Sequence, residues 1–224
     1  MTRRLSGGNV TCVSTATDSR PDDLAAGAFG AWLEEMRAAL RHETDADVPC
    51  GDCCACCSTS HFVHVGSEET DALAHIPPDL RFPAPGMPAG HVVLGYDQRG
   101  RCPMLDGGGR CTMYEHRPLT CRTYDCRIFA AAGIDADRDA ITRRARRWRF
   151  DCAAEGDGDG LAAVGAAAAW IREHAAAFPG GAVPDDPAQL AVLAVKVAGV
   201  FLPGGLAAEG EDEAAVAAAI VRSP

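Results

Sequence analysis

The chain has 224 residues, 47% of them hydrophobic, with a formal net charge of −10 and 11 cysteines. This length is sufficient to bury a hydrophobic core without disulfides or metal. The acidic balance argues against general binding to nucleic acid or to anionic membranes, because both partners require a basic surface. We therefore expect no nucleic acid and no membrane among its partners.

The N-terminal residues do not resemble a secretory signal, because Arg3 and Arg4 are not followed by an apolar run of about 7 to 15 residues. We expect a disordered tail over residues 1–20. The most apolar later stretch, 190–202, contains Lys196 and is shorter than the roughly 20 residues that cross a bilayer. The sequence therefore predicts a cytoplasmic protein. In a reducing cytosol, clustered cysteines bind metal or do redox work more often than they form disulfides.

The predicted elements of the first half are short. Apolar residues at three- and four-residue spacings predict a helix from about Asp22 to Glu43. After the cysteine-rich segment, residues 61–65 read as a strand, and a short helix follows Ser67 and ends at the prolines 77–78. The proline-rich stretch 76–90 predicts an ordered irregular loop.

Short antiparallel strands are predicted next, over 91–96, 101–105 and 111–116, joined by glycine turns at 97–100 and 106–110. Pro118 then begins a predicted helix that runs to Ala131.

The remainder of the chain is predicted to be helical. We expect Ile141, Ala145 and Trp148 on one face of an arginine-rich helix and a flexible connector over 155–160. Helices are then predicted over 161–178, after the cap Asp186, and over 213–221.

Together these elements predict an α+β fold, with a small metal-organised core of short antiparallel strands flanked by N-terminal and C-terminal helices. We expect a cysteine-cluster metal-binding domain over 21–152 and an alanine-rich helical region over 153–224.

The strongest signal is the segment CGDCCACC at 50–57. A C-x2-C spacing lets two thiolates converge on one ion, and a C-x2-C-x2-C run is also a spacing that binds iron–sulfur clusters. Three cysteines lie outside the regular pattern: Cys12, Cys54 and Cys152. The pattern itself comprises two complete sets of four: Cys50, Cys53, Cys56, Cys57, Cys102, Cys111, Cys121 and Cys126.

These residues resemble the YkgJ-type cysteine-cluster family, also called CxxCxxCC proteins and described as zinc- or iron-chelating domains. The match is carried by CGDCCACC and by CPMLDGGGRCTMYEHRPLTCRTYDC, over residues 50–126. Cys54 departs from the family pattern, at a position where a small residue that binds no metal is expected. The resemblance implies that the eight pattern cysteines bind zinc or an iron–sulfur centre.

The number of centres is open from the sequence. Neighbouring side chains diverge, so Cys56 and Cys57 are expected to face different ways. One possible partition puts Cys50, Cys53 and Cys56 with Cys102 on one centre. The remaining pattern cysteines would then form the second centre: Cys57, Cys111, Cys121 and Cys126.

Other polar residues near the cysteines in the sequence have two possible roles, at the metal or at the surface. Arg117 and Arg122 either offset thiolate charge through hydrogen bonds to sulfur or form surface pairs, such as Arg122 with Asp125. His61 and His64 point to opposite faces of a strand, so at most one of them could join a metal site.

Three functions fit these observations. The first is a binding module that chelates zinc or an iron–sulfur centre through thiolates. The second is an enzyme, because flagellin lysine-N-methylases carry a similar cysteine cluster within the wider family. The third is a redox carrier, whose cluster would transfer electrons. No S-adenosylmethionine loop is recognisable in the sequence.

Overall fold

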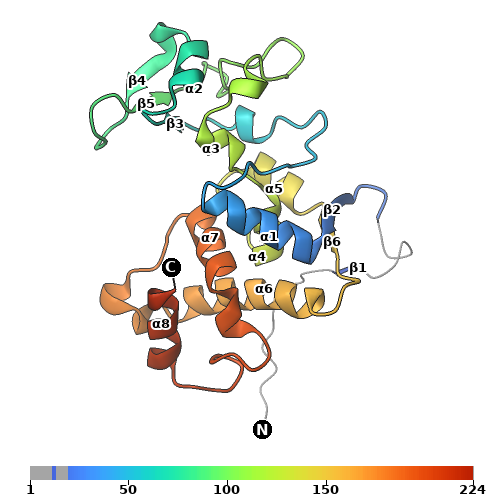
Figure 1. Ribbon diagram of the computed structural model, residues 1–224. Coiled ribbons are helices and arrows are strands. Elements are labelled where there is room, and N and C mark those ends of the chain that lie inside the picture. The colour runs from blue at the N-terminus through green and yellow to red at the C-terminus, as the bar shows by residue number, and fades with distance from the viewer. Residues whose placement is uncertain (1–11, 14–19, 224) are drawn as a thin grey trace. The chain divides into compact units, whose positions relative to one another are not determined.

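The computed structural model describes residues 12–13 and 20–223 (Figure 1). Helices combine with two small sheets, so the predicted α+β class is confirmed. The chain divides into two compact units. We call Met1–Ala38 with Cys126–Pro224 the helical unit, and Ala39–Asp125 the cysteine unit.

The helical unit contains a parallel sheet in the order β1-β6-β2, formed by Cys12–Val13, Trp148–Asp151 and Leu24–Ala28. The predicted helix from Asp22 is therefore wrong over its first residues, where β2 pairs with β6 instead. Gly27 has a φ of 89° and lies at a shift in the β2 register. A left-handed residue at this point ends any helix that begins earlier.

Helix α1, Phe29–Leu40, follows β2 directly. The rings of Phe29 and Trp32 lie 5.7 Å apart, and both contact Phe150 of β6, at 5.4 and 4.8 Å. All three side chains are buried. The predicted apolar stripe thus packs this helix against the sheet.

Two shorter helices, α4 (Arg127–Ala132) and α5 (Asp139–Ala145), precede β6. Trp148 lies on β6 and not on the arginine-rich helix, which ends earlier than predicted. Its indole is buried within the sheet, and strand pairing with β2 competes successfully with the helical pattern.

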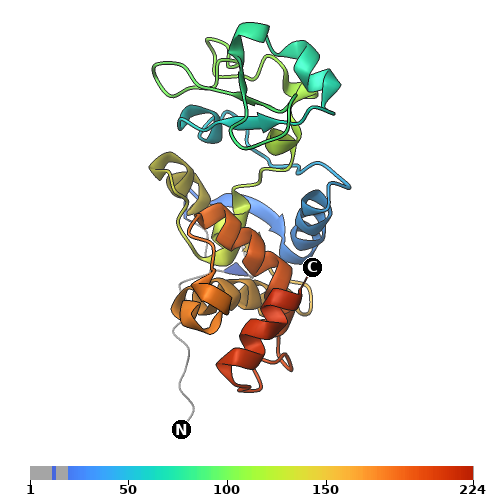
Figure 2. The ribbon, with the colours of Figure 1, turned by 90° about the vertical axis from the view of Figure 1, so that its left-hand side faces the viewer.

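The C-terminal helices pack around α6, Asp157–Glu173, which contacts α7, Pro187–Val197 (Figure 2). The connector predicted over 155–160 is wrong, because α6 begins within it and Asp157 is buried. Asp186 caps α7 as predicted, accepting the Gln189 N–H at 2.9 Å. Short 3-10 turns and α8 complete the region: Ala175–Ala177, Pro179–Gly181, Ala198–Phe201 and Glu213–Arg222.

The cysteine unit has an antiparallel sheet with β5, Val92–Leu94, between β3, Val63–Val65, and β4, Arg81–Pro83. β4 lies inside the stretch predicted as an irregular loop. The strands predicted at 101–105 and 111–116 reduce to one bridge between Leu105 and Cys111.

Short helices surround this sheet: η1 (Cys56–Ser58), α2 (Thr70–His75), η2 (Pro78–Leu80), η3 (Tyr114–His116) and α3 (Leu119–Arg122). The helix predicted from Pro118 to Ala131 is interrupted, because α3 ends at Arg122 and α4 begins at Arg127. A small core holds these elements, and Cys102 and Cys111 pack against it. Its buried members are Val65, Ala72, Ile76, Leu94, Met104 and Met113.

Most of the tail predicted for 1–20 lies outside the described residues, although Cys12–Val13 form β1. The segments 21–152 and 153–224 remain a predicted division of the sequence. Within 12–13 and 20–223, no helix is both long and apolar enough to cross a membrane.

Candidate metal centre

The segment 50–57 is folded by successive short turns. The Cys53 N–H donates to the Cys50 carbonyl at 3.1 Å, and the Cys57 N–H donates to the Cys54 carbonyl at 3.0 Å. The sulfurs of Cys56 and Cys57 lie 3.8 Å apart, so the expectation that these side chains diverge is wrong. Two sulfurs on a tetrahedral zinc, with Zn–S bonds of about 2.3 Å, are separated by about 3.8 Å. The 3-10 turn η1 therefore permits adjacent thiols to approach one ion.

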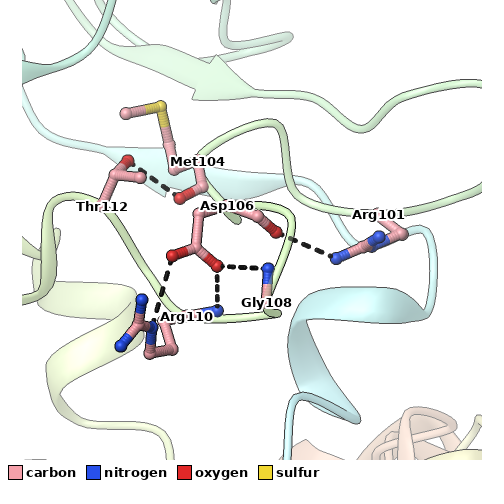
Figure 3. A network of polar contacts seen from close by, with 6 residues as sticks. All are labelled: Arg101, Met104, Asp106, Gly108, Arg110 and Thr112. Carbon is pink, nitrogen blue, oxygen red and sulfur yellow. Dashed lines mark hydrogen bonds and ion pairs between the residues drawn. The ribbon is translucent and has the colours of Figure 1, made fainter.

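Cys102 and Cys111 each follow a turn with the same hydrogen-bond pattern. Residues 97–102 read DQRGRC and residues 106–111 read DGGGRC. In the second turn, the Asp106 carboxylate accepts the N–H groups of Gly108 at 2.8 Å and Arg110 at 2.9 Å (Figure 3). In the first turn, Asp97 accepts the equivalent N–H groups two and four residues later, at 2.8 and 2.9 Å.

Each turn also has a glycine with a positive φ, 74° at Gly100 and 79° at Gly109. The repeat D-x-x-G-R-C thus places Cys102 and Cys111 at the same position after the same turn. Sequence reasoning predicted both turns but missed that they are copies, although the repeat is visible in the sequence.

Backbone hydrogen bonds join these turns to the other cysteine segments. The Cys102 N–H donates to the Cys57 carbonyl at 2.7 Å. Leu105 bridges to Cys111, and the N–H of Thr112 donates to the Met104 carbonyl at 2.8 Å. The Thr112 hydroxyl donates to the same carbonyl at 2.9 Å (Figure 3). These bonds bring segments 56–57, 102–105 and 111–112 side by side.

Cys121 is contributed by α3, which is anchored to the sheet and to α2. The Thr120 hydroxyl donates to the His64 carbonyl at 2.9 Å, and the Leu119 N–H donates to the Glu69 carboxylate at 2.5 Å. Burial raises the pKa of Cys121 to about 12, together with the nearby thiols of Cys102, Cys56 and Cys111. The thiols of Cys102, Cys56 and Cys111 are therefore near enough to oppose ionisation of Cys121, although among the described residues no three cysteine sulfurs all lie within 4.8 Å of one another.

The pKa values of Cys56 and Cys102 are also raised. The hydrogen bond between the thiols of Cys56 and Cys57 is the first cause that raises the pKa of Cys56, followed by burial. Burial is the first cause that raises the pKa of Cys102, and the charges of Cys111 and Cys56 add to it. A soft divalent cation would relieve this repulsion, because it binds the thiolate form. The donor set thus fits the chemistry of a zinc or iron centre.

The thiols whose charges raise the pKa of Cys121 belong to both predicted sets, because Cys56 and Cys102 come from one set and Cys111 from the other. Cys50, Cys53 and Cys54 are half-buried in the same unit. The Cys54 sulfur accepts a hydrogen bond from Ser58 at 3.5 Å.

Cys126 belongs to the helical unit, where it directly precedes α4. The Trp148 indole N–H donates to its sulfur at 3.3 Å. Cys152 is disulfide-bonded and is therefore not one of the free thiols. This disulfide does not agree with the expectation that the protein lies in a reducing compartment, where structural disulfides are rare.

The two arginines near the thiols have different surroundings. Arg117 stacks on the Tyr114 ring at 3.7 Å, and its charge lowers the pKa of Cys121 against the larger effect of burial. Arg122 donates to Asp45 at 2.6 Å, so the ion pair observed is not the i,i+3 pair with Asp125 that we considered.

The two candidate histidines lie apart from each other. His64 hydrogen-bonds His91 at 3.0 Å, and His61 lies 3.3 Å from the Thr59 hydroxyl.

A family model, CxxCxxCC, described as "Putative zinc- or iron-chelating domain", matches residues 49–143. Residues 49–143 carry the CxxCxxCC domain. The family recognised from the cysteine spacing is thereby confirmed over this segment, which includes every pattern cysteine. No curated protein and no solved structure is detectably similar to the chain.

Proposed function

We propose that the protein is a metal-chelating module in which thiolates of the CxxCxxCC domain hold zinc or an iron–sulfur centre. The observation that carries the proposal is the 3.8 Å separation of the Cys56 and Cys57 sulfurs, on a segment whose backbone also bonds to Cys102. Metal chelation itself is the activity described for the family. The bound metal would supply a cross-link between segments that have little other secondary structure.

The ligand set that we propose includes all eight pattern cysteines. The separation of 3.8 Å between the Cys56 and Cys57 sulfurs supports their binding to one ion. Cys50 and Cys53 lie in the same short turn and can complete a thiolate set. For Cys126, the indole hydrogen bond from Trp148 supports a thiolate role, because such donors stabilise sulfur charge.

We further propose that the protein works in the cytoplasm of a bacterium, where unliganded thiols stay reduced. The thiols of Cys53, Cys54 and Cys57, which form no disulfide, support this placement, whereas the disulfide at Cys152 does not. A redox carrier and a relative of lysine N-methylases remain the alternatives. A visible absorption band that dithionite bleaches would favour the redox carrier.

The test is metal analysis and an absorption spectrum of anaerobically purified protein. We expect zinc or iron at a stoichiometric level in the wild type and a large loss in Cys121→Ser. Cys54→Ser is the matched control, because it removes a thiol of the same unit that lies outside the family pattern. Wild-type protein without metal, or equal metal in wild type and Cys121→Ser, would contradict the proposal.

A further inference from the structure

Three side chains of the cysteine unit meet at its surface: Asp71, His75 and His116. One nitrogen or oxygen atom from each lies within 4.8 Å of the other two. The His116 Nδ1 donates to Asp71 Oδ2 at 2.8 Å, and the His75 Nδ1 lies 3.8 Å from Asp71 Oδ1. The two imidazole rings stack at 3.5 Å with an angle of 5° between their planes. Two imidazoles and a carboxylate therefore share one small volume.

The backbone holds this trio in place. Asp71 and His75 are four residues apart on α2, so their side chains share a face of the helix. His116 ends η3, which packs against α2. The buried residues Ile76 and Met113, which flank the two elements, belong to one hydrophobic core. The trio thus lies on elements that the core positions in advance.

Hydrogen bonds to the Glu69 side chain also support the trio. The Glu69 carboxylate accepts the N–H groups of Gly66 at 2.6 Å and Leu119 at 2.5 Å. It therefore ties the start of α2 to the chain three residues after His116. These bonds and the shared core restrain α2 relative to the segment of His116 without any contribution from the trio itself.

We propose that Asp71, His75 and His116 bind a divalent transition-metal ion of the zinc class, at a site separate from the thiolates. Imidazole nitrogen and carboxylate oxygen are ligands that zinc, nickel and copper accept. This site is independent of the function proposed above, because it uses none of the cysteines.

The distances suit such an ion. A tetrahedral ion about 2.0 to 2.1 Å from each ligand separates its ligand atoms by about 3.3 Å. The observed separations of 2.8 and 3.8 Å lie on either side of that value. They run to different oxygens of Asp71 and the two rings are stacked, so each imidazole must turn to direct its nitrogen at a shared ion. The His75 Nδ1 now donates to the Asp71 carbonyl at 2.9 Å, a bond that an ion at this nitrogen would replace.

Three protein ligands leave a coordination position for water or an external ligand. The Asp71 side chain is 70% exposed, so this position opens to solvent. An exposed site with three ligands should exchange its ion readily, in contrast to the partly buried thiols. We therefore expect a second, weaker class of bound metal.

The test is a Co²⁺ titration of the full chain after its thiolate metal has been loaded. Cobalt bound to thiolates gives intense sulfur-to-metal charge-transfer bands, whereas cobalt on imidazole and carboxylate does not. We expect one further equivalent of Co²⁺ to bind without new charge-transfer bands and to shift the ring-nitrogen NMR signals of His75 and His116. Saturable binding that leaves both histidine signals unmoved would overturn the proposal, as would no further binding.

Variants sharpen this test. His116→Gln should weaken the second class by at least about 100-fold, since loss of even an outer-shell partner commonly costs 10- to 100-fold. Asp71→Asn, which keeps the shape but removes the charge, should act in the same direction. His42→Asn is the matched control, because His42 is an exposed histidine of the same unit with a φ of 61°, which asparagine tolerates. Equal weakening in this control and in His116→Gln would contradict the site.

Discussion

The two units differ in how they are held together. The helical unit has helices of 12, 17 and 11 residues, α1, α6 and α7, and a core that includes the Phe29, Trp32 and Phe150 rings. The cysteine unit has strands of 3 residues and a longest helix of 6 residues. Its core contains few buried side chains and includes two of the cysteines at its border.

This difference indicates which unit should depend on bound metal for its stability. A small hydrophobic core stabilises a fold weakly, and small domains of this kind commonly depend on bound metal or disulfides. The helical unit has enough buried surface to fold by packing, whereas the cysteine unit brings its thiols together through turns and backbone hydrogen bonds. The predictions below test whether stability divides between the units in this way.

Removal of the metal should have the largest effect, and it should fall on the cysteine unit. Thiolate sites bind the folded chain, and structural zinc contributes about 10 to 16 kcal/mol in small modules. We expect hydrogen exchange in Ala39–Asp125 to accelerate strongly after chelation, while α6 and α7 keep their protection. Equal acceleration in both units, or none in the cysteine unit after verified removal, would refute the comparison.

A cavity in the helical unit should have a moderate effect and leave the metal in place. Ile171 of α6 is fully buried, so Ile171→Ala should lower the free energy of unfolding by about 2 to 5 kcal/mol. Denaturant unfolding and metal analysis measure the two quantities. Val221→Ala, at a side chain that is 58% exposed, should change stability little. Loss of metal in the Ile171 variant would show that the units depend on each other.

A substitution in the repeated turn should have a smaller, local effect. Gly109 has a φ of 79°, so Gly109→Ala should cost about 1 to 2 kcal/mol from backbone strain. Gly107→Ala is the matched control, because a methyl group there meets no atom within 4 Å and the backbone is not left-handed. We expect weaker metal retention in a chelator competition only for Gly109→Ala. Similar retention in both variants would argue that the turn does not position Cys111.

The pH dependence of the same turn should be the smallest effect. Hydrogen bonds from the backbone N–H of Arg110 and then of Gly108 hold the pKa of Asp106 below its usual value. A lowered pKa stabilises the fold above the unfolded pKa, and this contribution disappears as the pH falls through the folded pKa. The carboxyl carbon of Asp106 should therefore titrate below the range of a free aspartate in an NMR titration. A midpoint at the ordinary value would mean that the turn is open in solution.

The cysteine spacing by itself was enough to recognise the domain, because C-x2-C runs with further cysteines at these intervals have few other uses. The α+β class, the cap Asp186 and the turns at 97–100 and 106–110 were also predictable, since capping and turn chemistry depend on residues close in the chain. The repeat DQRGRC and DGGGRC is local in the same sense, and it was available from the sequence alone.

Other features depended on contacts between distant residues. Leu24–Ala28 and Trp148–Asp151 have helix-compatible sequences, yet they form strands because each supplies the other's hydrogen-bond partners. The approach of Cys102 to the segment of Cys56 and Cys57 depends on the bond between the Cys102 N–H and the Cys57 carbonyl, which no spacing rule specifies. The meeting of His116 with Asp71 spans 45 residues and requires α2 and η3 to share a core, so only the tertiary structure could bring those ligand atoms together.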